Sequence, residues 1–174
     1  LKVIDDHGNA LAAGERGELL IRGAAVFRGY WNRPDANKET FLPGGWMHTG
    51  DVAYLDDEGY LYIVDRIKDL VIRGGENIGC GEVEAALLEH PLVKEASVYA
   101  LPDQRLGEEV GATLYVSSSV TESELSGFLQ ERLAKFKIPR YIHQQQTPLP
   151  RTASGKILKR DLREEACQRL GLTQ

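Results

Sequence analysis

Residues 52–78, VAYLDDEGYLYIVDRIKDLVIRGGENI, contain two hairpin patterns separated by a short charged segment. In the first pattern, the apolar runs VAYL and YLYIV stand on either side of DDEG, an acidic turn that ends in glycine. In the second pattern, Gly74 and Gly75 separate LVIR from ENI, and both can adopt the positive φ that a two-residue turn requires. The charged segment around Lys68 and Asp69 therefore marks a join between two parts of the chain.

The hydrophobic pattern differs on the two sides of this join. Residues 1–66 are rich in short strand signals, with one short helix expected after Arg33, because Pro34 suits the first helical position. From about residue 69, strands alternate with helices. The elements expected there are a hairpin at 69–78, a helix at 81–90, strands at 95–101 and 111–118, a helix at 121–134, a further strand and a helix at 158–170. The predicted fold class is α+β: a small β-rich segment, then an α+β domain whose mostly antiparallel sheet is covered by helices.

Composition limits the classes of function. A formal net charge of -5 and a pI near 5.4 argue against nucleic acid as the main partner, because phosphate backbones select basic surfaces. The sequence has no apolar run long enough for a transmembrane segment and no secretory leader pattern, so a cytoplasmic location is expected. The two cysteines lie far apart and the four histidines have no ligand spacing, so no metal site is predicted. Because the chain starts without methionine, in a strand-like LKVIDD, we expect a piece of a longer polypeptide.

Asp51 and Arg66 are candidates for binding a sugar hydroxyl group. If Leu55 and Tyr60 flank the hairpin turn, Asp51 lies opposite Val64 and within about two residues of Arg66. A carboxylate there can accept hydrogen bonds from both hydroxyls of a ribose, with the guanidinium binding oxygen atoms beside it. The alternative is an ion pair with no functional role.

The roles of Lys68 and of the two glycines each have two possible interpretations. Lys68, at a charged and non-apolar join, can serve as a hinge or belong to a solvated linker. Gly74 and Gly75 can let a bound chain approach the backbone closely, or can simply make the hairpin turn.

Lys156 lies in TASGK, just before the last helix. A lysine on such a turn can bring a compact positive charge to an anion, as phosphoryl chemistry requires. The motif is not a P-loop, because no glycine precedes Lys156 by six residues and Ile157 stands where a hydroxyl residue is needed. An ordinary surface lysine is the alternative.

Several ordered motifs together resemble the acyl-CoA synthetases of the adenylate-forming superfamily. The resemblance runs nearly continuously, through GERGELLIRG, GYWNRP, GGWMHTGDVAYLDDEGYLYIVDRIKDLVIRGGENI, VEAALLEHPLVKEASVYALPD, KFKIPR and LPRTASGKILKRDLR. The family converts a carboxylic acid and ATP to an acyl-adenylate and pyrophosphate, then transfers the acyl group to a thiol. The resemblance implies a fatty-acyl-CoA synthetase in particular.

The resemblance implies a role for each candidate residue. Asp51 and Arg66 would bind the ribose of ATP, and Lys156 would be catalytic, bridging the carboxylate and the α-phosphate during adenylation. Lys68 would be the hinge, and Gly74 and Gly75 would line the pantetheine path of coenzyme A.

One segment departs from the family pattern. Where relatives commonly have a proline after GENI, this chain has Gly79, Cys80 and Gly81, which predict a more mobile loop with Cys80 as a small filler. The geometry of the thiol-accepting face is what this departure puts in question.

The resemblance also implies that much of the enzyme lies elsewhere. Residues 1–67 would be the last β-barrel segment of a large N-terminal domain, and residues 68–174 the mobile C-terminal domain. The partners expected are the missing N-terminal domain, the carboxylic acid, ATP and coenzyme A; the magnesium ligands would belong to the missing domain. The fragment alone would be inactive. The alternatives are an adenylation domain that loads a carrier protein and a freestanding, non-catalytic module that binds a nucleotide or a partner.

Overall fold

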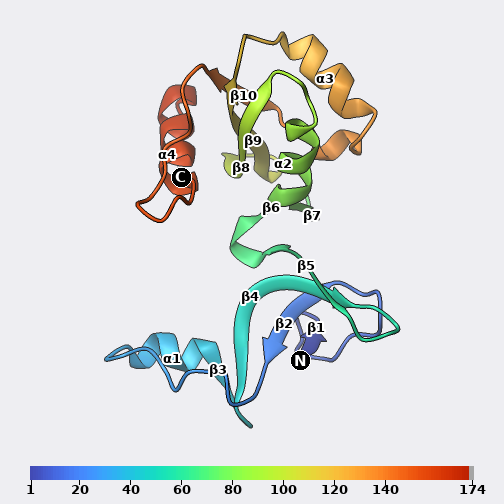
Figure 1. The fold of residues 1–174 in the computed structure, drawn as a ribbon, viewed down its shortest axis with the longest axis vertical. Coiled ribbons are helices and arrows are strands. Elements are labelled where there is room, and N and C mark those ends of the chain that lie inside the picture. The colour runs from blue at the N-terminus through green and yellow to red at the C-terminus, as the bar shows by residue number, and fades with distance from the viewer. Residues whose placement is uncertain (173–174) are drawn as a thin grey trace. The chain divides into compact units, whose positions relative to one another are not determined.

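The computed structural model of the protein describes residues 1–172, which form two compact units. Unit 1 is Leu1–Lys68, and unit 2 begins at Asp69 and takes in the rest of the described chain. Figure 1 shows the elements of both units, coloured from blue at the N-terminus to red at the C-terminus.

Unit 1 is built on one antiparallel sheet with a single helix among its described residues. Its elements are β1 (Lys2–Ile4), β2 (Gly17–Ile21), α1 (Pro34–Thr40), β3 (Phe41–Leu42), β4 (Trp46–Leu55) and β5 (Leu61–Arg66). The strand order is β1-β2-β4-β3, and β5 also pairs with β4. The core is small, with Val3, Leu19 and Ala53 at its centre. As predicted, Pro34 occupies the start of α1 and β4 and β5 form a hairpin.

Unit 2 alternates strands with helices. Its elements are β6 (Leu70–Arg73), β7 (Glu76–Gly79), α2 (Cys80–Leu88), β8 (Val93–Asp103), β9 (Gly107–Val116), α3 (Glu122–Gln130), the 3-10 turn η2 (Lys135–Lys137), β10 (Tyr141–Gln145) and α4 (Lys159–Leu170). The strand order is β10-β9-β6-β7, with β8 also paired to β9. Only the β10–β9 pairing is parallel among the described strands, so the predicted α+β class with a mostly antiparallel sheet is confirmed.

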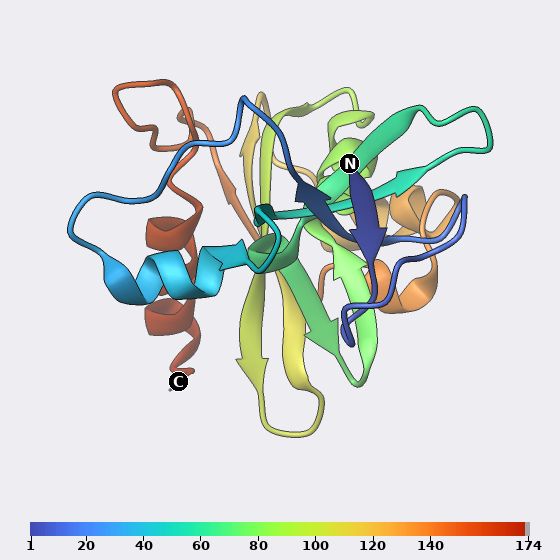
Figure 2. The same cartoon turned by 90° about the horizontal axis from the view of Figure 1, so that it is seen from below.

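Helices cover both faces of the unit 2 sheet (Figures 1 and 2). Successive side chains of a strand point to opposite faces, and β8 follows this rule. Ala96 and Val98 belong to the larger core, which also contains residues of α2 and α3. Tyr99 and Leu101 belong to a second core, against residues of α4. The sheet is therefore the middle layer of the unit.

Two helix ends follow strong local sequence signals, whereas the helix expected at residues 121–134 already ends at Gln130. Thr121 caps α3 by accepting a hydrogen bond from the backbone of Glu124 at 3.2 Å, and Gly171 ends α4 with φ 65°. The prediction of a mobile loop at residues 79–81 is wrong. Gly79 closes β7, and Cys80 is the first residue of α2 and only 1% exposed. Burial of Cys80 against the sheet stabilises the start of this helix. The glycines on either side of Cys80 are why the sequence did not indicate a helix start here.

Candidate functional site

Asp51 and Arg66 face each other directly across the β4–β5 hairpin. The register predicted from the turn places Val64 opposite Asp51, and that detail is wrong by two residues. Leu55 pairs with Leu61 and not with Tyr60, which shifts the register by one residue, and a bulge between Val52 and Ala53 adds the second. The guanidinium Nε lies 3.3 Å from Asp51 Oδ1. The structure thus brings together the carboxylate and the guanidinium that sequence reasoning placed close to each other.

Thr49 and Glu18 hold the backbone before Asp51. The Thr49 hydroxyl donates to the carbonyl of Leu19 at 2.8 Å and accepts from the Asp51 amide at 3.0 Å. Glu18 accepts from the amide of Gly50 at 3.2 Å, and Gly50 has φ 72°. The Asp51 side chain is 23% exposed, so its carboxylate is held in place yet remains accessible to a ligand.

Lys68 lies in the 3-10 turn η1 (Ile67–Asp69), which contains the boundary between the two units. On the unit 2 side of this boundary, Asp69 lies 3.8 Å from Lys159 Nζ at the start of α4. The same ammonium group lies 3.1 Å from Glu84 Oε1 of α2. The first residue of unit 2 is therefore paired with α4, and Lys159 in turn joins α4 to α2.

Gly74 and Gly75 form the predicted turn between β6 and β7, with φ values of 58° and 91°. At Gly75 a Cβ atom would meet nothing within 4 Å, whereas at Gly74 it would lie 3.2 Å from Leu106 Cδ2. The Gly74 amide donates to the carbonyl of Leu106 at 2.9 Å. The turn is therefore attached to the sheet at Gly74 and open to solvent at Gly75.

The Lys156 loop, residues 151–157, is a small hydrogen-bonded hairpin with an exposed lysine. Its ends are joined by a bridge between Arg151 and Ile157. Thr152 donates its amide to the Lys156 carbonyl at 2.8 Å, and its hydroxyl accepts from the Lys156 amide at 3.2 Å. Gly155, with φ 85°, donates to the Thr152 carbonyl at 2.9 Å. The backbone of this loop is thus internally paired, and its lysine side chain projects to solvent.

Sequence reasoning missed the residue that anchors this loop. Glu95 of β8 accepts hydrogen bonds from the Leu149 amide at 2.8 Å and from Arg151 Nη2 at 2.9 Å. Arg151 Nη1 in turn donates to the carbonyl of Gly155 at 2.7 Å. One guanidinium thus joins the sheet to the turn that precedes Lys156, and no local pattern marks a partner more than 50 residues away along the chain.

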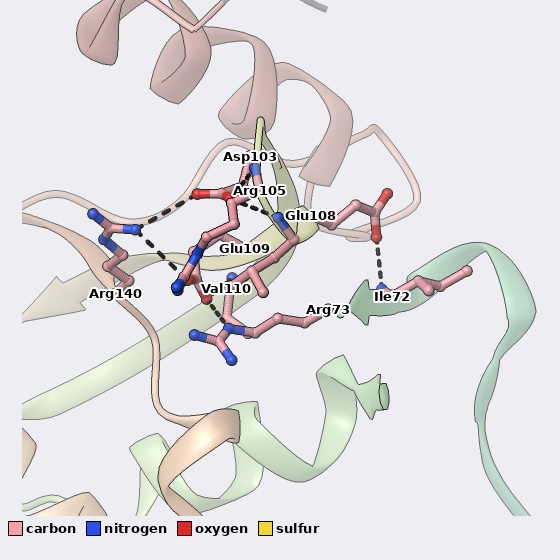
Figure 3. A network of polar contacts seen from close by, with 9 residues as sticks. Ile72, Arg73, Asp103, Arg105, Glu108, Glu109, Val110 and Arg140 are labelled. Atoms are coloured by element: carbon pink, nitrogen blue, oxygen red, sulfur yellow. Dashed lines mark hydrogen bonds and ion pairs between the residues drawn. The ribbon is translucent and has the colours of Figure 1, made fainter. Parts of the chain in front are cut away.

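A second cluster that sequence reasoning missed surrounds Glu109 of β9 (Figure 3). The side chain is 2% exposed and accepts from Arg73 Nε at 2.5 Å. Hydrogen bonding to this carboxylate raises the pKa of Arg73 above its usual value. Arg140 Nη1 lies 3.9 Å from the other carboxylate oxygen and 3.5 Å from Asp103.

Residues 1–172 lack two further features. This part of the chain has no cluster of three or more His, Cys, Asp or Glu residues suited to hold a metal ion. None of its helices has both the length and the apolar character needed to cross a membrane.

Residues 82–156 match the sequence model of a family described as the AMP-binding enzyme C-terminal domain. Among curated proteins, the 2-succinylbenzoate–CoA ligase of Bacillus velezensis is 48% identical over 161 residues, covering 92% of this chain and 33% of the relative. The corresponding ligase of Bacillus cytotoxicus is 44% identical over 164 residues, with the same coverage of 92% and 33%. The chain spans about one third of the length of the curated relatives it matches.

Solved structures of similar proteins also match most of this chain. The o-succinylbenzoate CoA synthetase MenE from Bacillus subtilis, in complex with the acyl-adenylate intermediate OSB-AMP, has a TM-score of 0.85 and 43% identity. This chain covers 33% of it, and the match takes in 92% of the chain. ATP-bound MatB from Rhodopseudomonas palustris has a TM-score of 0.86 and 35% identity, with coverage of 94% of this chain and 33% of MatB.

Proposed function

Since the chain belongs to the adenylate-forming superfamily and carries its AMP-binding enzyme C-terminal domain, we propose that it works as the C-terminal part of an ATP-dependent carboxylate–CoA ligase. The reaction has two steps. A carboxylate oxygen attacks the α-phosphorus of ATP and releases pyrophosphate, and the thiolate of coenzyme A then attacks the acyl carbon and releases AMP. The observation that carries the proposal is the 48% identity to a named CoA ligase across 161 residues.

The acid that we propose to test first is 2-succinylbenzoate. The two curated relatives and the MenE structure carry that substrate in their names, and they give no support to the fatty acid expected from the sequence. Most of the relatives' length lies outside this chain, so the acid pocket and the magnesium ligands are assigned to the rest of the polypeptide.

The first step is assigned to Lys156, Asp51 and Arg66. The Asp51 carboxylate accepts hydrogen bonds from the ribose hydroxyls, and the Thr49 hydroxyl, which accepts from the Asp51 amide, supports its orientation. The Lys156 ammonium neutralises charge that develops between the entering carboxylate and the α-phosphate. Its paired loop backbone limits the entropy lost when the lysine engages its target.

The second step is assigned to the Gly74–Gly75 turn, with Lys68 as the hinge between the two steps. The open space at Gly75 lets the pantetheine chain pass close to the backbone. Lys68 lies in the turn that contains the boundary between the two units, and this location supports its role as the hinge. A rotation there exchanges Lys156 for the glycine turn, so that one face of unit 2 serves each step.

The test uses the full-length ligase and its Lys156→Ala variant, with 2-succinylbenzoate as the acid. We expect the variant to lose adenylate formation, measured by ATP–pyrophosphate exchange, and to retain thioester formation from a supplied acyl-adenylate. Lys94→Ala, which removes an exposed lysine from β8, is the matched control and should leave both steps unchanged. Equal loss of both steps in Lys156→Ala would contradict the division of labour between the two faces.

A further inference from the structure

The carboxylate of Glu109 is buried and only partly paired. One oxygen, Oε1, accepts from Arg73 Nε at 2.5 Å and from the Val110 amide at 3.0 Å. The other oxygen, Oε2, is buried and has no hydrogen-bond donor among the described residues. Its neighbour, Arg140, lies at 3.9 Å and is 57% exposed, so solvent weakens that interaction. Arg73 is therefore the principal partner of a charge removed from water (Figure 3).

A buried carboxylate holds its counterion strongly, because separating the pair leaves an uncompensated charge in a medium of low dielectric constant. Arginine suits this role, since its planar guanidinium keeps a fixed direction for each N–H donor. Only 25% of the Arg73 side chain is exposed. Glu109 therefore determines where the Arg73 side chain lies. It thereby also fixes the backbone of Arg73, which is the residue immediately before Gly74.

Arg73 is the middle one of three consecutive residues that the β8–β9 hairpin holds. On one side, the Ile72 amide donates to Glu108 Oε2 at 2.7 Å, as Figure 3 shows. On the other side, the Gly74 amide donates to Leu106 O at 2.9 Å.

These contacts matter because the ladder between β6 and β9 is short. Within the described residues, the register between the two strands consists of a single pair, Arg73 and Gly107. Strand pairing alone therefore does little to fix the angle of the β6–β7 hairpin, and the side chains of residues 108 and 109 supply what the ladder lacks.

We propose that Glu109 is a positioning residue for thioester formation: acting through Arg73, it fixes the Gly74–Gly75 turn against which the pantetheine of coenzyme A passes. This inference rests on the proposed function and adds to it a residue outside every motif that carries the family resemblance. Glu109 touches no substrate. Its effect comes from geometry, since a displacement of about 1 Å in a positioning element can reduce a rate by about 100-fold.

The test compares both half-reactions in the full-length ligase and in Glu109→Gln, which keeps the shape of the side chain and removes its charge. We expect kcat of thioester formation from a supplied acyl-adenylate to fall about 10- to 100-fold. Adenylate formation should stay within about twofold of the unsubstituted enzyme, because the Lys156 loop is anchored separately, by Glu95. A purely structural role for Glu109 would not divide the two steps in this way.

Two other variants complete the design. Arg73→Lys keeps a cation beside Glu109 but loses the planar guanidinium with its fixed N–H directions, so it should show a smaller defect in thioester formation. This variant provides the test if Glu109→Gln fails to fold. Arg132→Gln breaks a more exposed Arg–Glu pair elsewhere in unit 2, where Nε lies 2.8 Å from Glu89, and should leave both steps unchanged.

Hydrogen exchange distinguishes failure of this inference from failure of the proposed function. In Glu109→Gln the Gly74 amide should exchange faster than in the unsubstituted protein, whatever reaction the protein catalyses. If the unsubstituted ligase makes no CoA thioester but this change appears, the proposed function is wrong and the positioning contact stands. Equal loss of both half-reactions, unchanged thioester formation or unchanged exchange at Gly74 would each overturn the inference.

Discussion

Replacing Glu95 with glutamine should loosen the Lys156 loop. The carboxylate of Glu95 accepts from the Leu149 amide and from Arg151, and Arg151 holds the carbonyl of Gly155. Glutamine can still accept the Leu149 hydrogen bond through its carbonyl oxygen, but it removes the charge that holds Arg151. Local opening of residues 149–157 should therefore become easier while the rest of unit 2 is little affected.

The magnitude follows from the burial of the two partners. A hydrogen bond to a charged group contributes about 1.5–3 kcal/mol, but Arg151 is 42% exposed and Glu95 21%, so solvent screens part of this energy. We expect Glu95→Gln to cost about 1 kcal/mol, a roughly fivefold rise in the open population. Glu95→Ala should cost about 2–3 kcal/mol, because it also leaves the amide of the buried Leu149 without its acceptor.

Native-state hydrogen exchange across residues 149–157 measures this opening directly. Glu131→Gln is the control, because that carboxylate is 79% exposed and belongs to another part of unit 2. Adenylate formation by the full-length ligase should fall severalfold in Glu95→Gln, since Lys156 then spends less time correctly placed. Unchanged exchange in Glu95→Ala would refute the anchoring scheme.

The effect should depend on pH with a definite sign. Burial alone would raise the pKa of Glu95, but the hydrogen bonds from Leu149 and Arg151 outweigh it and lower the pKa below its ordinary value of 4.5. A lowered pKa in the folded state means that the stabilisation is complete above pH 4.5 and is lost as the pH falls through the lowered value. The difference between the unsubstituted protein and Glu95→Gln should therefore shrink in acid, and a difference that grew between pH 7 and pH 3 would contradict this reasoning.

Three further predictions concern stability and nucleotide binding. Thr121→Ala should destabilise unit 2 by about 1 kcal/mol in urea unfolding, because the hydroxyl caps α3 at 3.2 Å; a change of only a few tenths would argue against the cap. Gly111→Ala should cost about 1–3 kcal/mol, since the new Cβ would lie 2.6 Å from Leu101 Cδ1. The matched Gly127→Ala in α3, where a Cβ meets nothing within 4 Å, should instead raise the melting temperature. Asp51→Asn in the full-length ligase should raise KM for ATP about tenfold or more and leave KM for coenzyme A unchanged; equal changes in both would exclude a specific ribose contact.

Elements with strong local signals were predictable from the sequence. The Gly74–Gly75 turn, Pro34 at the start of α1 and Gly171 at the end of α4 each depend on the conformational preference of one or two residues. The strands β8 and β9 were predicted too short. They continue toward their connecting turn through a polar segment, residues 102–110, whose composition resembles a loop.

The candidate site was predictable only where its parts are close in sequence. Asp51 and Arg66 belong to one hairpin, so turn position gave their proximity to within two residues. The exact turn length and the bulge, which together make them direct partners, have no clear sequence signal. Nothing in the sequence singles out Glu109, and glutamate is rarely buried unless it is paired. Its partner, Arg73, lies 36 residues away, and only the folded sheet brings the two together.

The parallel pairing of β10 with β9 also constrains the order in which unit 2 can form. The two strands meet with Tyr141 opposite Gly111, and α3 lies between them in the chain, whereas β8 and β9 are joined by a tight turn. Because closing a short loop costs less entropy, the β8–β9 hairpin can form early, and β10 must wait for the α3 crossover. During synthesis, β9 therefore emerges from the ribosome with residues 111–115 unpaired on one edge, and that stretch remains open to a wrong partner until residues 141–145 arrive.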